Sequence, residues 1–170
     1  MAIVNTKATA IGNRDAAPMV LTPAHLVRGI TYQAVGTVEK AGSDSNGSVY
    51  RLARLRSSDR VSSVHLLNDA ITGATSFDVG LYKTADAGGA VVDADLFASA
   101  IDLSSASASA GVDVTYEATP TNIDKVEKRL WELLGLSADP QLEYDLALTA
   151  NTAGAGAGTI SVRVAYCAGN

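Results

Sequence analysis

The sequence has little of the chemistry on which most enzymes and metalloproteins depend. Its 170 residues include one cysteine and two histidines. A single cysteine, Cys167, excludes an internal disulfide framework and a multi-cysteine zinc site. His25 and His65 belong to no Gly-x-Ser-x-Gly or His-Glu-x-x-His motif, and these are the motifs expected of many hydrolases and zinc proteases. We therefore expect a protein that is not an enzyme and that holds no cofactor and no metal.

Long apolar segments and an excess of positive charge are also missing. No apolar run approaches the roughly 20 residues of a membrane-spanning helix, and the N-terminus lacks the charged and apolar regions of a signal peptide. Lys and Arg number 13 against 18 Asp and Glu, which gives a net charge of -5. This balance disfavours non-specific binding to nucleic acid. We expect no secretion, no membrane partner and no nucleic-acid partner.

The sequence does contain enough aliphatic residues for one core. Val, Leu, Ile and Phe number 41 of 170 residues, whereas disordered chains fall below roughly 20% of these types. A length of 170 residues is typical of one domain. We predict a single β-sandwich domain over residues 41–170, preceded by an extended N-terminal arm over residues 1–40.

The arm prediction depends on the pattern of the first forty residues, which have no sustained period of two or of 3.6. A short strand is predicted within residues 27–38. Large aliphatic residues are spaced along the arm like anchors on a surface, whereas a frayed, solvated terminus, the alternative, usually carries fewer of them. The candidate contacts with a neighbouring surface or subunit are Ile3, Val4, Ile11, Met19 and Leu21.

Beyond Val49 the pattern changes to short strands separated by turns. Arg51, Arg54 and Arg56 are expected to face solvent or a partner. The segment 61–67 has apolar residues on both faces, which predicts a bulge or a buried strand. The segment 75–83 alternates cleanly and predicts a strand, while 91–103 fits either a helical turn or a strand.

Two late segments alternate most regularly, 142–148 and 160–166. The loop between them consists mainly of Ala, Gly and Thr, so we predict an antiparallel hairpin with one buried face. Many short strands with Gly-bearing turns indicate a sandwich of two sheets. Gly154, Gly156 and Gly158 resemble a phosphate-binding loop, but they lead into a strand rather than a helix, which favours a hairpin tip.

One helix is predicted, starting at Thr121 or Asn122 and ending at Gly135. Its apolar stripe has helical spacing. Trp131 lies at the edge of the stripe, where it either seals the helix against the sheet or offers a platform for a nucleobase or sugar. The stripe consists of Ile123, Val126, Leu130, Leu133 and Leu134.

Three aspartates, Asp86, Asp93 and Asp95, flank a Gly-rich turn and could hold a hard cation, although a solvated loop is the simpler interpretation.

Three segments resemble small structural proteins of tailed bacteriophages. They are SVHLLNDAITGATSFDVGLYKT (63–84), GGAVVDADLFASAIDLS (88–104) and GTISVRVAYCAGN (158–170). The resemblance covers residues 49–170 and leaves the arm uncovered. It implies a jelly-roll-like β-sandwich that acts as a capsid decoration or cement protein, binding the major capsid protein on the outside of the virion.

The resemblance also implies a homo-oligomer, a dimer or a trimer, and carries over no catalytic residue. The arm could then add a strand to a neighbour's sheet or lie along the capsid. The alternative is a carbohydrate- or host-binding module that uses Trp131, Tyr82 and the loop 84–90. The nine aromatic residues of the chain (one Trp, six Tyr and two Phe) are few for a sugar-binding surface. A small hydrolase is a third interpretation, and its motifs are absent.

Overall fold

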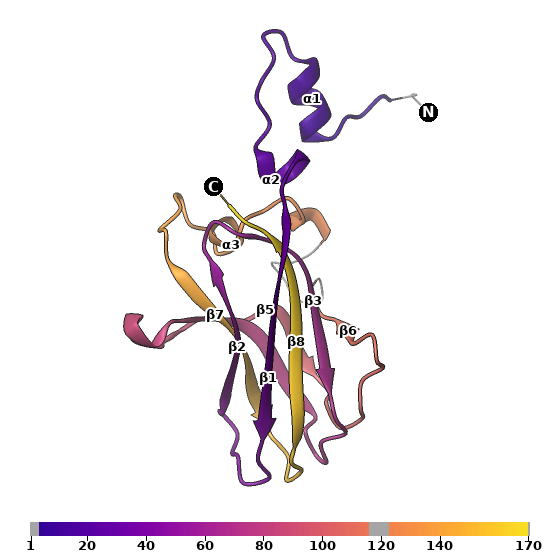
Figure 1. Cartoon of the computed structure of the whole chain (residues 1–170), viewed down its shortest axis with the longest axis vertical. Helices are drawn as coiled ribbons and strands as arrows, with labels where there is room; N and C mark the ends of the chain where they lie inside the picture. The colour runs from indigo at the N-terminus through magenta and orange to yellow at the C-terminus, as the bar shows by residue number, and fades with distance from the viewer. Residues whose placement is uncertain (1–3, 116–122, 170) are drawn as a thin grey trace.

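The computed structural model describes residues 4–115 and 123–169 and consists of two antiparallel four-stranded sheets packed face to face (Figure 1). Sheet A contains, in order, β1 (Thr31–Lys40), β8 (Gly158–Cys167), β3 (Arg60–Asn68) and β6 (Val112–Asp113). Sheet B contains β2 (Val49–Arg56), β7 (Glu143–Thr152), β4 (Ser76–Lys83) and β5 (Val91–Ile101). The predicted all-β sandwich is confirmed.

The helices are short. They are α1 (Thr9–Asp15), α2 (Ala24–Val27) and α3 (Leu130–Leu133), with the 3-10 turns η1 (Ala85–Ala87) and η2 (Ile123–Lys125). Within the described part of the chain, no helix has the length and apolar character needed to cross a membrane.

The core lies between the two sheets and follows the alternation of the sequence. On β4 the side chains of Phe77, Val79 and Leu81 are fully buried. On β8, Ile160, Val162 and Val164 are buried while the residues between them are partly exposed. Because each such side chain contributes roughly 1.5–3 kcal/mol on burial, these two strands hold the sheets together.

The predicted hairpin of the last two strands is wrong. β7 pairs with β2 and β4 in sheet B, whereas β8 pairs with β1 and β3 in sheet A. The loop 153–157 therefore crosses from one sheet to the other. Alternation specifies that each strand has one face toward the core, and strands in facing sheets satisfy that pattern as well as strands in one sheet do.

A buried lysine holds the crossing loop. Lys40 is 1% exposed, and its Nζ donates to the carbonyl oxygens of Ala41, Gly154 and Gly156 at 3.0, 3.2 and 2.9 Å. The crossing loop also contacts the loop between β3 and β4, because the N–H of Gly156 donates to the carbonyl of Thr72 at 3.0 Å. These bonds satisfy polar groups that the crossing would otherwise bury unpaired.

The predicted helix over 121–135 is largely wrong. Its capping residues, 121 and 122, lie outside the described residues, and between η2 and α3 the chain is not helical. The N–H groups of Leu130 and Trp131 donate instead to the carbonyls of Asp59 and Ser57 in the β2–β3 turn. These tertiary bonds, with the fully buried side chain of Leu130, override the local helical pattern. Gly135 follows the end of α3 with φ +70, as predicted.

Three segments that the sequence left open are resolved. The register of β3 against β8 shifts between Val61 and Ser63, which is the expected bulge. The segment 91–101 is strand β5, with register shifts against β4, rather than a helical turn. β1 is longer than the strand predicted within 27–38 and belongs to sheet A, so residues 4–30 form the part of the arm outside the sheets. The division into an arm and a domain at residue 40 stays a prediction.

Candidate functional site

The N-terminal arm projects from the end of the sandwich at which β1 begins (Figure 1). α1 contains no buried residue. Of the five candidate contacts, Ile3 lies outside the described residues. The other four do not pack on the chain's own sandwich, and their exposed fractions are 77% for Val4, 51% for Ile11, 63% for Met19 and 85% for Leu21. The arm therefore presents large aliphatic side chains to its surroundings.

The arm is less extended than the sequence predicts, because it folds back on itself after α1. The N–H of Val20 donates to the carbonyl of Asn13 at 3.0 Å, and Asn13 Nδ2 donates to Thr22 Oγ1 at 3.4 Å. Lys7 Nζ pairs with Asp15 Oδ2 at 2.6 Å, with both side chains about half exposed, so the pair adds little stability. These contacts all lie within residues 7–22, which makes the arm a separate folded loop.

His25 on α2 fixes the arm to the sandwich. The guanidinium of Arg129 donates to His25 Nδ1 at 3.0 Å, and Arg60 Nε donates to the His25 carbonyl at 3.3 Å. Burial, with the charges of Arg129 and Arg60, lowers the pKa of His25, so the neutral ring is the acceptor at neutral pH. Just beyond, Gly29 passes so close to Cys167 that an added Cβ would lie 3.2 Å from its Sγ.

Cys167 is buried and lies among polar groups near the junction of the arm with the sandwich. Arg60 Nη2 donates to its sulfur at 3.3 Å, and the Thr31 hydroxyl lies 3.9 Å away. The thiol is thus part of the contact between β1, β8 and β3. The sequence around Cys167, which has no activating motif, favours a structural thiol, and the pairing of β8 with β1 and β3 brings these groups together.

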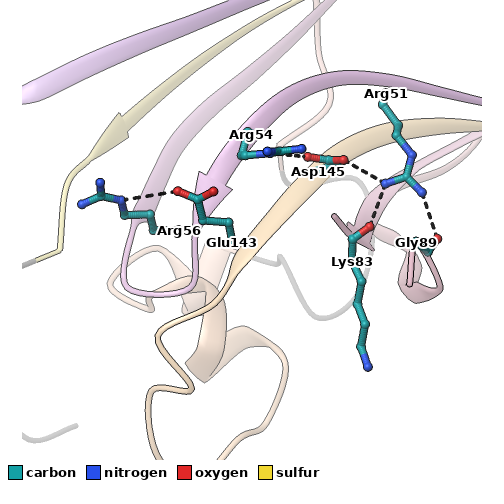
Figure 2. A network of polar contacts seen from close by, with 7 residues as sticks. All are labelled: Arg51, Arg54, Arg56, Lys83, Gly89, Glu143 and Asp145. Carbon is teal, nitrogen blue, oxygen red and sulfur yellow. Dashed lines mark hydrogen bonds and ion pairs between the residues drawn. The ribbon is translucent and has the colours of Figure 1, made fainter. Parts of the chain in front are cut away.

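A network of charges lies on the outer face of sheet B (Figure 2). The register of β2 against β7 shifts between Arg51 and Ala53, and this bulge sets Arg51 and Arg54 on the same side. Arg51 Nη1 and Arg54 Nε bind the two oxygens of Asp145 at 2.9 and 2.8 Å. The basic residues expected to face solvent or a partner therefore find partners within the chain.

The environment of Asp145 decides its charge state. Burial by itself raises the pKa of this carboxyl, but hydrogen bonds from Arg54 and Arg51 and their charges outweigh burial and hold the pKa below its usual value. Arg51 also donates to the carbonyls of Lys83 and Gly89 at 2.8 and 2.9 Å. It thereby ties the β4–β5 turn to β2. The neighbouring pair of Arg56 and Glu143 is longer, at 3.9 Å, and exposed.

The residues considered for sugar binding do not form an exposed aromatic surface. Tyr82 is buried, with the guanidinium of Arg51 5.3 Å from its ring centroid and its hydroxyl 2.6 Å from Thr149 Oγ1. Trp131 is half-buried, and its Nε1 has no hydrogen-bond partner among the described residues. Trp131 is therefore no exposed platform, and its sealing of a helix against the sheet stays a prediction.

The aspartates considered for a cation are not gathered into a site. Residues 4–115 and 123–169 contain no group of three or more His, Cys, Asp or Glu side chains arranged to hold a metal ion. Burial and a hydrogen bond with Asp95 raise the pKa of Asp93. The two carboxyls are therefore neighbours whose like charges oppose one another.

Comparison with known proteins shows similarity in fold alone. The chain matches no known protein family, and no curated protein is similar to it in sequence. A chain in the capsid of Ralstonia phage GP4 matches with a TM-score of 0.59 and 14% identity, over 88% of this chain and 92% of that chain. A chain of the cyanophage Pam1 capsid asymmetric unit matches with a TM-score of 0.49 and 17% identity over the same shares. The Ralstonia phage match shows that the β-sandwich of this chain is a fold present in a phage capsid.

Proposed function

We propose that this chain is a structural protein of a tailed-bacteriophage virion. It binds the outer surface of the capsid, with the major capsid protein as its partner, and stabilises the shell as a cement or decoration protein. Copies of the chain associate with one another as a dimer or a trimer. The proposal includes no catalytic step, no cofactor and no nucleic-acid or membrane partner.

The observation that carries the proposal is the projecting arm, on a sandwich whose fold also occurs in the Ralstonia phage GP4 capsid. Val4, Met19 and Leu21 are each more than half exposed. Burying one such side chain stabilises an interface by roughly 1.5–3 kcal/mol, and clustered exposed aliphatics mark interaction surfaces. An arm with these residues and its own internal hydrogen bonds suits docking onto another protein.

Capsid symmetry strengthens such a contact. A shell repeats one binding surface many times, and an oligomer with several arms engages neighbouring copies of that surface together. The second contact is then effectively intramolecular, which raises the overall affinity by about 100-fold or more without any new kind of interaction. A weak arm contact is therefore sufficient for stable decoration.

Sedimentation with capsid shells stripped of accessory proteins tests the proposal. We expect the full chain to sediment with the shells, saturably and at a fixed ratio to the shell subunit. Removing residues 1–22 is expected to lower the bound fraction about tenfold or more, because that segment carries the candidate contacts. The hydrogen bonds of residues 7–22 that the structure shows remain within the arm, so the sandwich should keep its melting temperature.

A pair of matched point variants separates the arm from general surface hydrophobicity. Leu21→Ser removes an exposed aliphatic on the arm, while Val91→Ser removes one at the start of β5, where the exposed fraction is 54%. We expect weaker sedimentation for the first and no change for the second. If the full chain does not bind shells at all, the proposed function is wrong. If the truncated chain binds as well as the full chain, the arm is not the anchor.

A further inference from the structure

A cavity of about 180 Å³ lies where the arm meets the sandwich. Its walls come from α2, the start of β1, the segment leading into α3 and the end of β8. The residues that give it chemical character are His25, Arg28, Ile30, Tyr32 and Arg129. None of the residues that line it is acidic.

The arginines at this cavity lack acidic partners. Within residues 4–115 and 123–169, neither Arg28 nor Arg129 forms an ion pair, and neither does Arg60 next to them. This differs from Arg51, Arg54 and Arg56, each of which pairs with a carboxylate of β7. Three guanidinium groups therefore lie near one another on a chain whose net charge is -5. The carboxylate of Glu132, which accepts from the backbone N–H of Arg129 at 2.7 Å and acts on the charge of His25, offsets part of this positive charge.

Two of these arginines are held in position by neutral acceptors. Arg129 donates to His25 Nδ1. Arg60 donates to the carbonyls of His25 and Val126 at 3.3 and 3.4 Å and to Cys167 Sγ at 3.3 Å. Neutral acceptors orient a guanidinium without cancelling its charge, so Arg129, which lines the cavity, is pre-organised to bind an anion.

Two exposed residues that line the cavity are largely apolar. Ile30 is 70% exposed, and Tyr32 is 47% exposed with its ring stacked on Tyr166 at a centroid distance of 5.9 Å. Arginines and apolar side chains that line one cavity together match a carboxylate side chain with aliphatic neighbours, as on a protein surface. A strongly hydrated inorganic anion gains nothing from the apolar side chains.

We propose that this cavity binds a carboxylate side chain on an acidic segment of the partner protein, with Arg28 and Arg129 as its ligands. The inference rests on the proposed function, because it names the chemistry that the capsid surface presents beside the arm. Guanidinium groups bind carboxylates through paired hydrogen bonds that are both strong and directional. The apolar arm would then supply most of the apolar contact area with the partner protein, and the cavity would determine where on that protein the chain docks.

Titration of the whole chain with poly-L-glutamate at low ionic strength, followed by the NMR signals of backbone amides, tests this inference without any capsid. We expect saturable shifts in residues 24–32 and at Arg129 and Ala168. Arg28→Ala should weaken binding about tenfold, which corresponds to the loss of about 1.4 kcal/mol. Arg28 is exposed and its side chain has no hydrogen bond or ion pair within the described residues, so this variant is expected to fold. Arg129→Gln, which keeps amide donors near His25, is the second variant, and it should also weaken binding.

Arg14→Ala is the matched control, because it removes the same charge from an exposed position on α1 away from the cavity. It should leave the affinity unchanged. Equal weakening by Arg14→Ala and Arg28→Ala would show general charge attraction and overturn the proposal. So would shifts confined to other surfaces, or equally strong binding of inorganic phosphate. Because no shell is present, failure here would leave the capsid-binding proposal standing, and failure of capsid sedimentation would leave this result standing.

Discussion

At the scale of single residues, Asp145 is the charge that organises the outer face of sheet B. It is 5% exposed and accepts hydrogen bonds from two arginines of β2 (Figure 2). A buried carboxylate with two guanidinium partners is stabilising only while it is ionised. The pKa of Asp145 is held below its usual value of 3.8 by those partners, so the stabilisation is present above about pH 4 and is lost as pH falls through the lower, folded-state pKa.

Replacing this carboxylate gives a prediction with a defined pH dependence. Asp145→Asn keeps the shape of the side chain and removes its charge. We expect the free energy of unfolding at pH 7 to fall by about 2 kcal/mol, since two charge-assisted hydrogen bonds are weakened. The difference between the native chain and the variant should shrink as the pH is lowered from 4 toward 2. Urea unfolding followed by circular dichroism at several pH values measures both.

Glu143 offers the control on the same strand. Its ion pair with Arg56 is 3.9 Å long, and the two side chains are 49% and 71% exposed. Exposed pairs of this kind contribute little, so Glu143→Gln is expected to change stability by less than about 0.5 kcal/mol at every pH. Equal effects of the two substitutions would contradict the role assigned to Asp145.

At the scale of elements, the sequence predicts single strands better than their partners. The alternation on 75–83 and 160–166 predicts β4 and β8 and the faces they bury. Which strands pair depends on contacts between distant residues, such as Lys40 with the loop 153–157, and periodicity does not encode them. The same holds for the pairing of Arg51 with Asp145, which requires the bulge in β2.

The helix predicted over 121–135 fails for a related reason. Leu130 of the predicted stripe is fully buried and Leu133 and Leu134 pack on the core, whereas Ile123 and Val126 are exposed. The short α3 buries the last part of the stripe without the long helix that the spacing predicts. The carbonyls of Ser57 and Asp59 capture the N–H groups that would have continued a helix. For the candidate site, the sequence alone predicts the aliphatic arm residues as contacts. The cavity where the arm meets the sandwich joins residues from four separate segments, so no local sequence pattern predicts it.

The crossing loop provides a test at the level of elements. Gly154 has φ +66, and a Cβ added to it would lie 2.3 Å from the backbone carbon of Gly73. Gly47 also has a positive φ, +87, but an added Cβ would meet nothing within 4 Å. Gly47→Ala should therefore lower the free energy of unfolding by about 1 kcal/mol, through backbone strain alone. Gly154→Ala should cost at least about 2 kcal/mol more, because it also pushes two backbone segments apart.

Thermal and urea unfolding of the two glycine variants measure this difference. Both substitutions add one methyl group at a left-handed position, so their comparison isolates the close approach of the loop 153–157 to the loop at Gly73. Equal losses of stability would contradict the packed crossing between the sheets. The result would then favour a loosely held loop.

At the scale of the whole molecule, the two ends of the sandwich differ. The arm leaves from the end that carries α3 (Figure 1). The cationic cavity lies at the same end, where the arm meets the sandwich. The arm and its junction with β1 carry exposed aliphatic side chains, for example Met19, Leu21 and Ile30. The turns at the opposite end, 41–48 and 153–157, consist mainly of Gly, Ala, Ser and Asp or Asn. This asymmetry predicts that the molecule docks with the arm end toward its partner and the turns facing away.

A cryo-EM difference map between decorated and bare capsid shells tests whether this chain binds the outside of the shell. We expect density for one β-sandwich per chain on the outer surface of the shell, with the arm end in contact with the major capsid protein and the turns 41–48 and 153–157 outward. Absence of added density, density inside the shell, or a sandwich that contacts the shell through these turns would contradict the proposed function.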